Sequence, residues 1–142
     1  MVRVVLDTNV CLDVFVFADP RAAALAAALA SGEVGAVTRA DCRDEWMAVL
    51  GYPTLKLDDA RRAEALARYD AQTLTLPTLP APEGLPRCRD PDDQKFLELA
   101  ATSGASTLFS RDAEVLRLGR RAQRDGLFAI MVPEAWEGPA RA

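Results

Sequence analysis

Four acidic residues stand at positions where carboxylates can act together: Asp7, Glu45, Asp93 and Asp112. Asp7 directly follows residues 2–6, a short apolar and β-branched run that is typical of a buried parallel strand. In an open parallel sheet the functional crevice lies at the carboxyl ends of the strands, so we expect Asp7 to face it. An Asx turn or a helix N-cap is the alternative use of this residue.

Asp93 and Asp112 each stand at the head of an apolar stripe with helical spacing. Asp93 precedes Phe96 and Leu97 at i+3 and i+4, and Asp112 begins the same spacing just after a predicted strand. Each carboxylate is therefore expected to point along the apolar side of its helix. The alternative is a plain helix start, because aspartate is favoured in the first turn. Asp90 competes with Asp93 for the site position.

Glu45 lies in the middle of a predicted helix, beside an apolar stripe that includes Cys42, Trp46 and Val49. A half-buried glutamate is costly unless a cation neutralises it, although a glutamate on a helix surface is the more common case. Several carboxylates in one crevice would repel one another. A hard divalent cation, Mg²⁺ or Mn²⁺, explains why a fold would tolerate them, since such ions prefer carboxylate oxygens.

The composition excludes several other chemistries. The chain has no histidine, which rules out His-based triads, imidazole general bases and His-ligated zinc. Its cysteines, Cys11, Cys42 and Cys88, are far apart and form no C-x-x-C pair, so we interpret them as reduced thiols. The net charge of −4 counts against a plain nucleic-acid-binding module, but bound divalent cations would offset it locally.

Strand and helix patterns alternate along the chain. Strands are expected at residues 2–6, 34–38, 106–110 and 128–132, and helices at residues 10–17, 21–30, 39–50, 58–69, 90–103 and 112–124. Residues 74–88 are rich in proline and are expected to form an extended loop. The alternation predicts an α/β fold in a single domain, residues 1–142, with a central parallel sheet that has helices on both faces.

No part of the sequence suggests a membrane segment. The apolar stretches stop well short of the roughly 18 residues that a span requires. Asp7 and Asn9 interrupt the start of the chain too early for a secretory leader. With reduced cysteines, the expected compartment is the cytoplasm.

Five segments, spread over almost the whole chain, carry a family resemblance: Val-Leu-Asp7-Thr8-Asn9-Val, Glu45, Asp93-Gln-Lys-Phe-Leu-Glu-Leu-Ala100, Leu-Phe-Ser110-Arg-Asp112 and Val-Pro-Glu134-Ala-Trp136. In these segments the chain resembles the PIN-domain family, in particular the VapC-like toxins of bacterial toxin–antitoxin modules. Four acids in this order, each at its expected secondary-structure position, make the resemblance fairly specific.

The resemblance implies a PIN-like fold and a metal-dependent endoribonuclease with Mg²⁺ or Mn²⁺ as cofactor. The residues that it implies for the site are four acids, catalytic and metal-binding, and their polar support: Asp7, Glu45, Asp93, Asp112, and Thr8, Asn9 and Ser110. Such a centre activates a water and steadies the attacking and leaving oxygens of a phosphodiester. The acids are ligands and can also take a proton from that water. The resemblance, and not the chemistry, favours RNA over DNA.

Arginines near the acidic positions are candidate phosphate contacts, which add affinity without reading sequence. They are Arg111, Arg117, Arg120, Arg121 and Arg124 around and after Asp112, and Arg87 and Arg89 before Asp90. A solvated, charged helix face is the alternative reading of the arginines after Asp112.

A toxin further implies partners: an RNA substrate, a cognate antitoxin whose helix lies in an apolar groove, and a second copy in a homodimer. Phe15, Phe17 and the alanine-rich helix at residues 21–30 are candidates for such surfaces. Packing into the core is the alternative use of these residues.

Two other classes of protein stay open. A carboxylate- and metal-dependent phosphoryl hydrolase, or a phosphoacceptor domain, would share the sheet and the aspartate after the first strand. Asp7-Thr8-Asn9 lacks the second acid of such motifs, and the only lysines are Lys56 and Lys95. A non-catalytic PIN-like interaction protein is the other class, but a degenerate site has no reason to keep four costly carboxylates.

Overall fold

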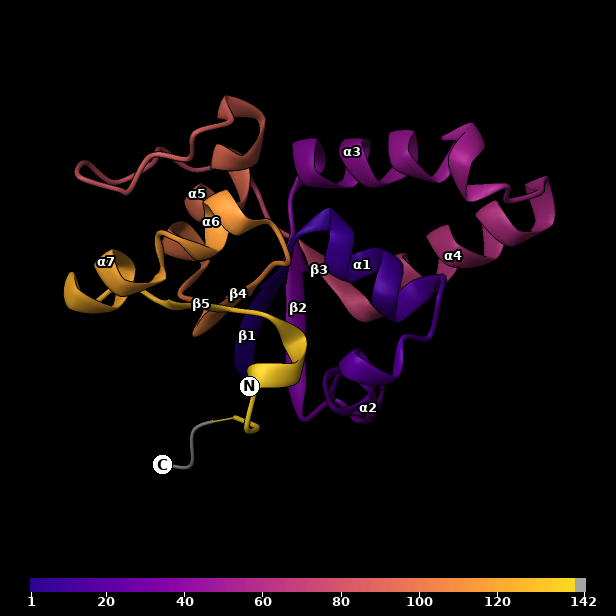
Figure 1. Cartoon of the computed structure of the whole chain (residues 1–142), viewed down its shortest axis with the longest axis horizontal. Helices are drawn as coiled ribbons and strands as arrows, with labels where there is room; N and C mark the ends of the chain where they lie inside the picture. The colour runs from indigo at the N-terminus through magenta and orange to yellow at the C-terminus, as the bar shows by residue number, and fades with distance from the viewer. Residues whose placement is uncertain (140–142) are drawn as a thin grey trace.

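Five parallel strands run through the centre of the molecule, with the first strand in the middle (Figure 1). The computed structural model describes residues 1–139. The strand order is β3-β2-β1-β4-β5. The strands are β1 (Val2–Leu6), β2 (Val34–Thr38), β3 (Thr73–Thr75), β4 (Thr107–Phe109) and β5 (Ala129–Met131). The parallel α/β architecture that the alternating pattern predicts is confirmed.

Helices cover both faces of this sheet (Figure 1). They are α1 (Thr8–Phe15), α2 (Ala23–Ser31), α3 (Ala40–Leu50), α4 (Asp59–Gln72), α5 (Gln94–Ser103), α6 (Ala113–Leu116) and α7 (Gly119–Arg124), with 3₁₀ turns η1 (Pro20–Ala22), η2 (Pro53–Leu55), η3 (Pro91–Asp93) and η4 (Pro133–Ala135). Within residues 1–139, no helix has the length and apolarity that crossing a bilayer requires.

The strands feed two separate cores because successive side chains point to opposite faces of the sheet. Val4 and Leu6 of β1 belong to the core under α1 to α4, and Val5 belongs to the core under α5 to α7. In the first core Phe15 packs edge-on against Trp46, with ring centroids 6.2 Å apart. Val4, Val5 and Leu6 are thus buried on the two faces of β1, as its nearly continuous apolar sequence predicts.

The sheet reverses its direction of growth beside β1. The chain steps from β1 to β2 and β3 on one side, and then places β4 and β5 on the other side. Leu6 pairs with Phe109, and the amide of Asp7 donates to the Phe109 carbonyl at 2.9 Å. The residues that follow β1 and β4 therefore meet at a topological switch point, where open α/β sheets place their ligands.

The structure contains a short edge strand, β3, that the sequence did not predict. Its three residues overlap the start of the loop expected at residues 74–88, and Leu74 pairs with Val37 of β2. A three-residue strand of this kind forms because a neighbour supplies the hydrogen-bond ladder, and a local pattern does not reveal that neighbour.

The prediction of a single helix at residues 112–124 is wrong in detail, because the segment forms two short helices, α6 and α7. Between α6 and α7 the amide of Leu118 donates to the Val115 carbonyl at 3.0 Å, a tightened 3₁₀-type turn. Gly119, a poor helix former, begins α7. The break changes the direction of the chain before β5.

Candidate active site

A chain of hydrogen bonds links Asp7 to Asp112 at the carboxyl edge of the sheet. Asp7 is the N-cap of α1, with Oδ1 accepting from the Thr8 amide at 2.7 Å. Its Oδ2 accepts from the Ser110 hydroxyl at 2.7 Å. The Ser110 Oγ in turn accepts from the Asp112 amide at 3.1 Å. Ser110 is fully buried, so the predicted polar support aligns the two carboxylate-bearing segments directly.

Glu45 reaches the same edge from α3. The hydroxyl of Thr8 donates to Glu45 Oε2, and the ammonium of Lys95 donates to Oε1 at 2.9 Å. Thr8 therefore stands between Asp7 and Glu45. The cation that a half-buried glutamate needs is supplied by a lysine 50 residues away in the sequence.

Asp112 and Asn9 serve the local backbone as well as the cluster. Asp112 is the N-cap of α6, and its Oδ1 accepts from the amides of Glu114 and Val115 at 2.8 and 3.2 Å. The Asn9 Oδ1 accepts from the Arg111 amide at 3.1 Å, which ties the chain after β4 to α1. The position of Asp112 thus depends on contacts from both neighbouring segments.

Asp93 joins the cluster through electrostatics. It lies half-buried where η3 passes into α5. Burial, followed by the negative charges of Asp7, Asp112, Asp90 and Glu45, raises the pKa of Asp93 to about 6. The four predicted acids therefore act on one another across elements that are far apart in sequence.

Asp90 and Asp93 differ in their surroundings. Asp90 is exposed, and its carboxylate accepts from the Asp92 amide at 2.9 Å, as the N-cap of η3. Asp90 therefore serves as a helix start, and its charge also contributes to the raised pKa of Asp93.

Burial also raises the pKa of Asp7, the most enclosed of the acids. Hydrogen bonds from Ser110 and Thr8 act in the opposite direction, and the charges of Glu45 and Asp112 add to the rise. The charged form of Asp7 is therefore less stable than that of a solvated aspartate. A bound cation would relieve this repulsion.

Two residues at the cluster were not found from the sequence, Lys95 and Cys88. Burial raises the pKa of the Cys88 thiol to about 11, with further contributions from Asp93 and Asp7, so the thiol borders the acids. For Lys95 the sequence did contain a signal, because a half-buried Glu45 needs a counter-charge and the chain contains only two lysines. The pattern of Cys88 carried no comparable signal.

The arginines suggested as phosphate contacts have varied surroundings. Arg111 donates to Asp13 through Nε and to Glu134 through Nη1, at 2.7 Å for the second contact, so a phosphate role is not supported for it. Arg117 is exposed and pairs with Glu114 on α6 at 3.1 Å. The exposed Arg121 lies 3.7 Å from Asp125. For Arg117 and Arg121 the solvated-face reading and the phosphate reading both stay open.

The donor set fits a hard divalent cation in kind, since it consists of carboxylate and hydroxyl oxygens. In the part of the chain that the structure describes, no three acidic or thiol side chains stand close enough to share one ion as they are placed. Mg²⁺ commonly needs only one or two protein carboxylates and keeps several waters.

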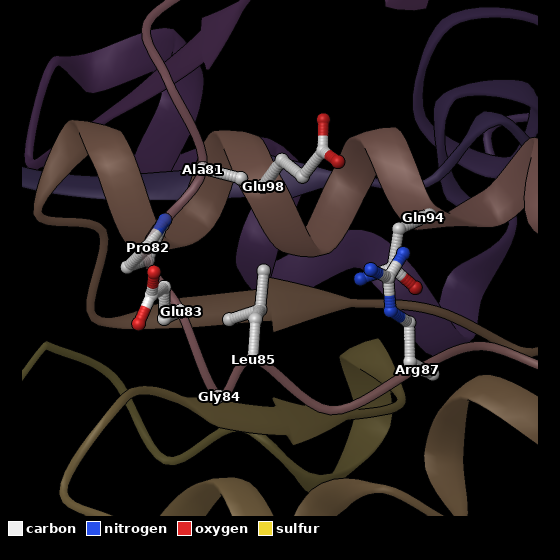
Figure 2. Close-up of a pocket in the computed structure, with 8 residues that line it drawn as sticks. All are labelled: Ala81, Pro82, Glu83, Gly84, Leu85, Arg87, Gln94 and Glu98. Atoms are coloured by element: carbon white, nitrogen blue, oxygen red, sulfur yellow. The ribbon is translucent and has the colours of Figure 1, made fainter.

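A cavity of about 310 Å³ lies beside α5, between this helix and the loop at residues 81–87. Figure 2 shows Leu85 pointing from the loop toward the helix, with Arg87 and Gln94 together at one end and the Glu98 carboxylate directed away from the loop. None of the four acids lines this cavity. The cavity is thus separate from the acidic cluster.

Comparison with protein families agrees with this geometry. The model of a family described as PIN domain matches residues 3–114, a range that contains all four acids. The chain belongs to the PIN-domain family. PIN domains are generally nucleases and typically use divalent metals, so the family places this chain among proteins that hydrolyse nucleic acids. No curated protein is similar enough to this PIN domain to be matched to it.

Proposed function

We propose that this PIN domain is a metal-dependent endoribonuclease whose centre is formed by Asp7, Glu45, Asp93 and Asp112. The observation that carries the proposal is their convergence at the switch point of the sheet. Ser110 and Thr8 connect three of the acids through hydrogen bonds, and the charges of those three raise the pKa of Asp93. The raised pKa values of Asp7 and Asp93 at a strand edge are typical of a functional site.

The chain's own groups divide the work of hydrolysis between them. Carboxylates of the cluster would hold Mg²⁺ or Mn²⁺, which when bound polarises the phosphodiester and acidifies a water. Ser110 and Thr8 orient Asp7 and Glu45, as hydrogen-bonding neighbours of ligands do. A carboxylate of the cluster can also accept the proton that the attacking water loses.

The biological role that we propose is the toxin of a toxin–antitoxin pair in the cytoplasm. The VapC-like resemblance across the chain and the three free cysteines support this role. An antitoxin and a second copy of the chain are the proposed partners. Phe15 is buried in the core, so of the two phenylalanines suggested for these surfaces only Phe17, which is 54% exposed, is available.

The test is cleavage of labelled RNA and labelled single-stranded DNA in Mg²⁺, Mn²⁺ or EDTA. We expect RNA to be cut only with metal, and Asp7→Asn and Asp93→Asn each to lower the rate at least about 100-fold, as expected when a metal shell is broken. Asp59→Asn is the matched control, because the Asp59 side chain is 95% exposed on α4. Undiminished cleavage in EDTA would contradict the metal mechanism.

One observation favours a second candidate, a non-catalytic PIN-like interaction protein. Both oxygens of Glu45 are already engaged, and among residues 1–139 no three acids are placed around a common point. The same assay decides between the two, since a non-catalytic interaction protein would cut neither substrate in any metal.

A further inference from the structure

Among the four acids, as residues 1–139 are placed, Glu45 differs from the others because its carboxylate is paired with a cation of the protein. Oε2 accepts from the Thr8 hydroxyl, and Oε1 accepts from the Lys95 ammonium at 2.9 Å. The side chains of Lys95 and Glu45 are 16% and 27% exposed, so water screens this ion pair only in part. The charge of this carboxylate is therefore already balanced by a protein cation, which weakens its attraction for a second cation.

Lys95 is itself held by more than Glu45. Its ammonium also donates to the backbone carbonyl of Asp92, in the turn that precedes α5, and lies 5.2 Å from the centre of the Phe96 ring. Phe96 is buried, which places the lysine stem against the core. The ammonium therefore occupies a defined position between α3 and the start of α5, immediately beside the turn that carries Asp93.

We propose that Lys95 is a positioning residue that acts as the built-in counter-ion of Glu45. The inference rests on the proposed metal-dependent function and divides the acids into two groups. Asp7, Asp93 and Asp112 are left to hold the divalent ion, and Glu45 forms a permanent ion pair that holds Thr8, and through it the turn at Asp7, in place. One of the four negative charges is thus neutralised by the protein itself.

This division makes a prediction for the protein without metal. Lys95→Met would leave the Glu45 carboxylate half-buried among like charges, which is more costly than losing both partners together. In EDTA we expect Lys95→Met to lower the melting temperature by about 3–6 °C, and Lys95→Met/Glu45→Gln and Lys95→Arg to recover much of that loss. Lys56→Met, which removes the same charge from an exposed turn, is the matched control. Equal melting temperatures for Lys95→Met and Lys56→Met would overturn the counter-ion role.

The second experiment asks whether Glu45 is a ligand, and it uses calorimetric titration of the full chain with Mn²⁺. The variant Lys95→Met/Glu45→Gln keeps the net charge of the cluster unchanged. We expect it to bind Mn²⁺ within about threefold of wild type, whereas Asp93→Asn loses at least about tenfold. Lys95→Met alone should bind Mn²⁺ more tightly, because it frees Glu45 to coordinate. A double variant that loses as much affinity as Asp93→Asn would show that Glu45 is a direct ligand and overturn the division.

Failure of this inference differs from failure of the proposed function. A wild type that binds no Mn²⁺ at millimolar concentration would contradict the metal-dependent nuclease, and the division of ligands with it. A different result would reject only the role of Lys95 and leave the proposed function standing. In that result wild type binds Mn²⁺ and cleaves RNA normally, whereas Lys95→Met/Glu45→Gln binds Mn²⁺ as weakly as Asp93→Asn does.

Discussion

At the scale of single residues, the pKa of Asp93 reflects its burial and the negative charges around it. Burial and the neighbouring carboxylates raise its pKa to about 6, and no hydrogen bond of the kind that Ser110 gives to Asp7 works against the rise. Its ionised form is therefore a source of instability in the folded protein without metal.

The first prediction concerns neutralising the charge of Asp93. Asp93→Asn removes repulsion and leaves the shape nearly unchanged, so we expect it to raise the melting temperature in EDTA by about 3 °C if the relief is about 1 kcal/mol. Wild type should gain more than the variant from added Mn²⁺, because a ligand that binds the folded state stabilises it by mass action. Thermal melts of both proteins, with EDTA and with Mn²⁺, measure this.

A lower melting temperature for Asp93→Asn in EDTA would have a different explanation. If Asp93 were only a helix start, losing its negative charge near the helix N-terminus would lower stability by about 0.3–1 kcal/mol, with equal metal shifts in both proteins. That combination of results would remove Asp93 from the site.

The second prediction concerns pH. The unfolded carboxyl of Asp93 titrates near its ordinary value of 3.8 and the folded one at about 6. Between these values folding takes up a proton, so this contribution to stability is fully present below the lower pKa and is lost as the pH rises through 6. In EDTA, the melting temperature of wild type should therefore rise relative to Asp93→Asn when the pH falls from 7.5 to 5.5. Parallel pH profiles for the two proteins would contradict the raised pKa.

At the scale of elements, Asp112 combines two tasks at the start of α6. It caps the helix by accepting from two backbone amides, and its charge belongs to the acidic cluster. Because α6 has only four residues, it depends on this cap more than a long helix does. The two tasks can be separated, since asparagine caps a helix about as well as aspartate does.

We therefore predict different results for two substitutions at this position. Asp112→Ala should lower the unfolding free energy by about 1 kcal/mol relative to Asp112→Asn, because only alanine loses the cap. Both should lose most of the stabilisation by Mn²⁺. Asp58→Ala is the matched control, since Asp58 caps α4 by accepting from the Arg61 amide at 2.7 Å and has no part in the cluster. Thermal melts with and without Mn²⁺ measure all three, and a full Mn²⁺ response in Asp112→Asn would exclude Asp112 from the centre.

At the scale of the whole molecule, the protein combines a net charge of −4 with a local concentration of carboxylates at one edge of the sheet. General attraction to nucleic acid is therefore weak, and under the proposed function productive contact would depend on the centre itself. A nuclease of this kind acts in the cell only where its metal and its substrate are both available, and a toxin also needs an inhibitor.

The corresponding prediction is a growth phenotype. Expression of the chain alone in a bacterial host should arrest growth, because cleavage of cellular RNA would be unrestrained, and expression of Asp7→Asn should not. Growth curves at matched protein levels, checked by immunoblotting, measure this. Equal growth of the two strains would favour a housekeeping nuclease or a binding role.

The sequence by itself determined the features that depend on neighbouring residues. Residues 34–38 were predicted as a strand and form β2, because their apolar run is itself the reason for burial on both faces. Asp7 could be placed at a strand end, since strand and turn signals are local. The α/β class followed from the alternation of such signals along the chain, and the family match at residues 3–114 agrees with it.

Only the tertiary structure decided which distant side chains meet. Glu45 lies 50 residues from Lys95 in the sequence, and Arg111 lies 98 residues from Asp13. Neither ion pair could therefore be predicted from the local sequence. The edge strand β3 likewise exists because β2 offers it a hydrogen-bond ladder. The physical reason is the same for the two ion pairs and for β3. A charged group or a backbone hydrogen-bonding group pairs with whichever partner the packed fold brings near, and the spacing of residues in the sequence does not reveal that partner.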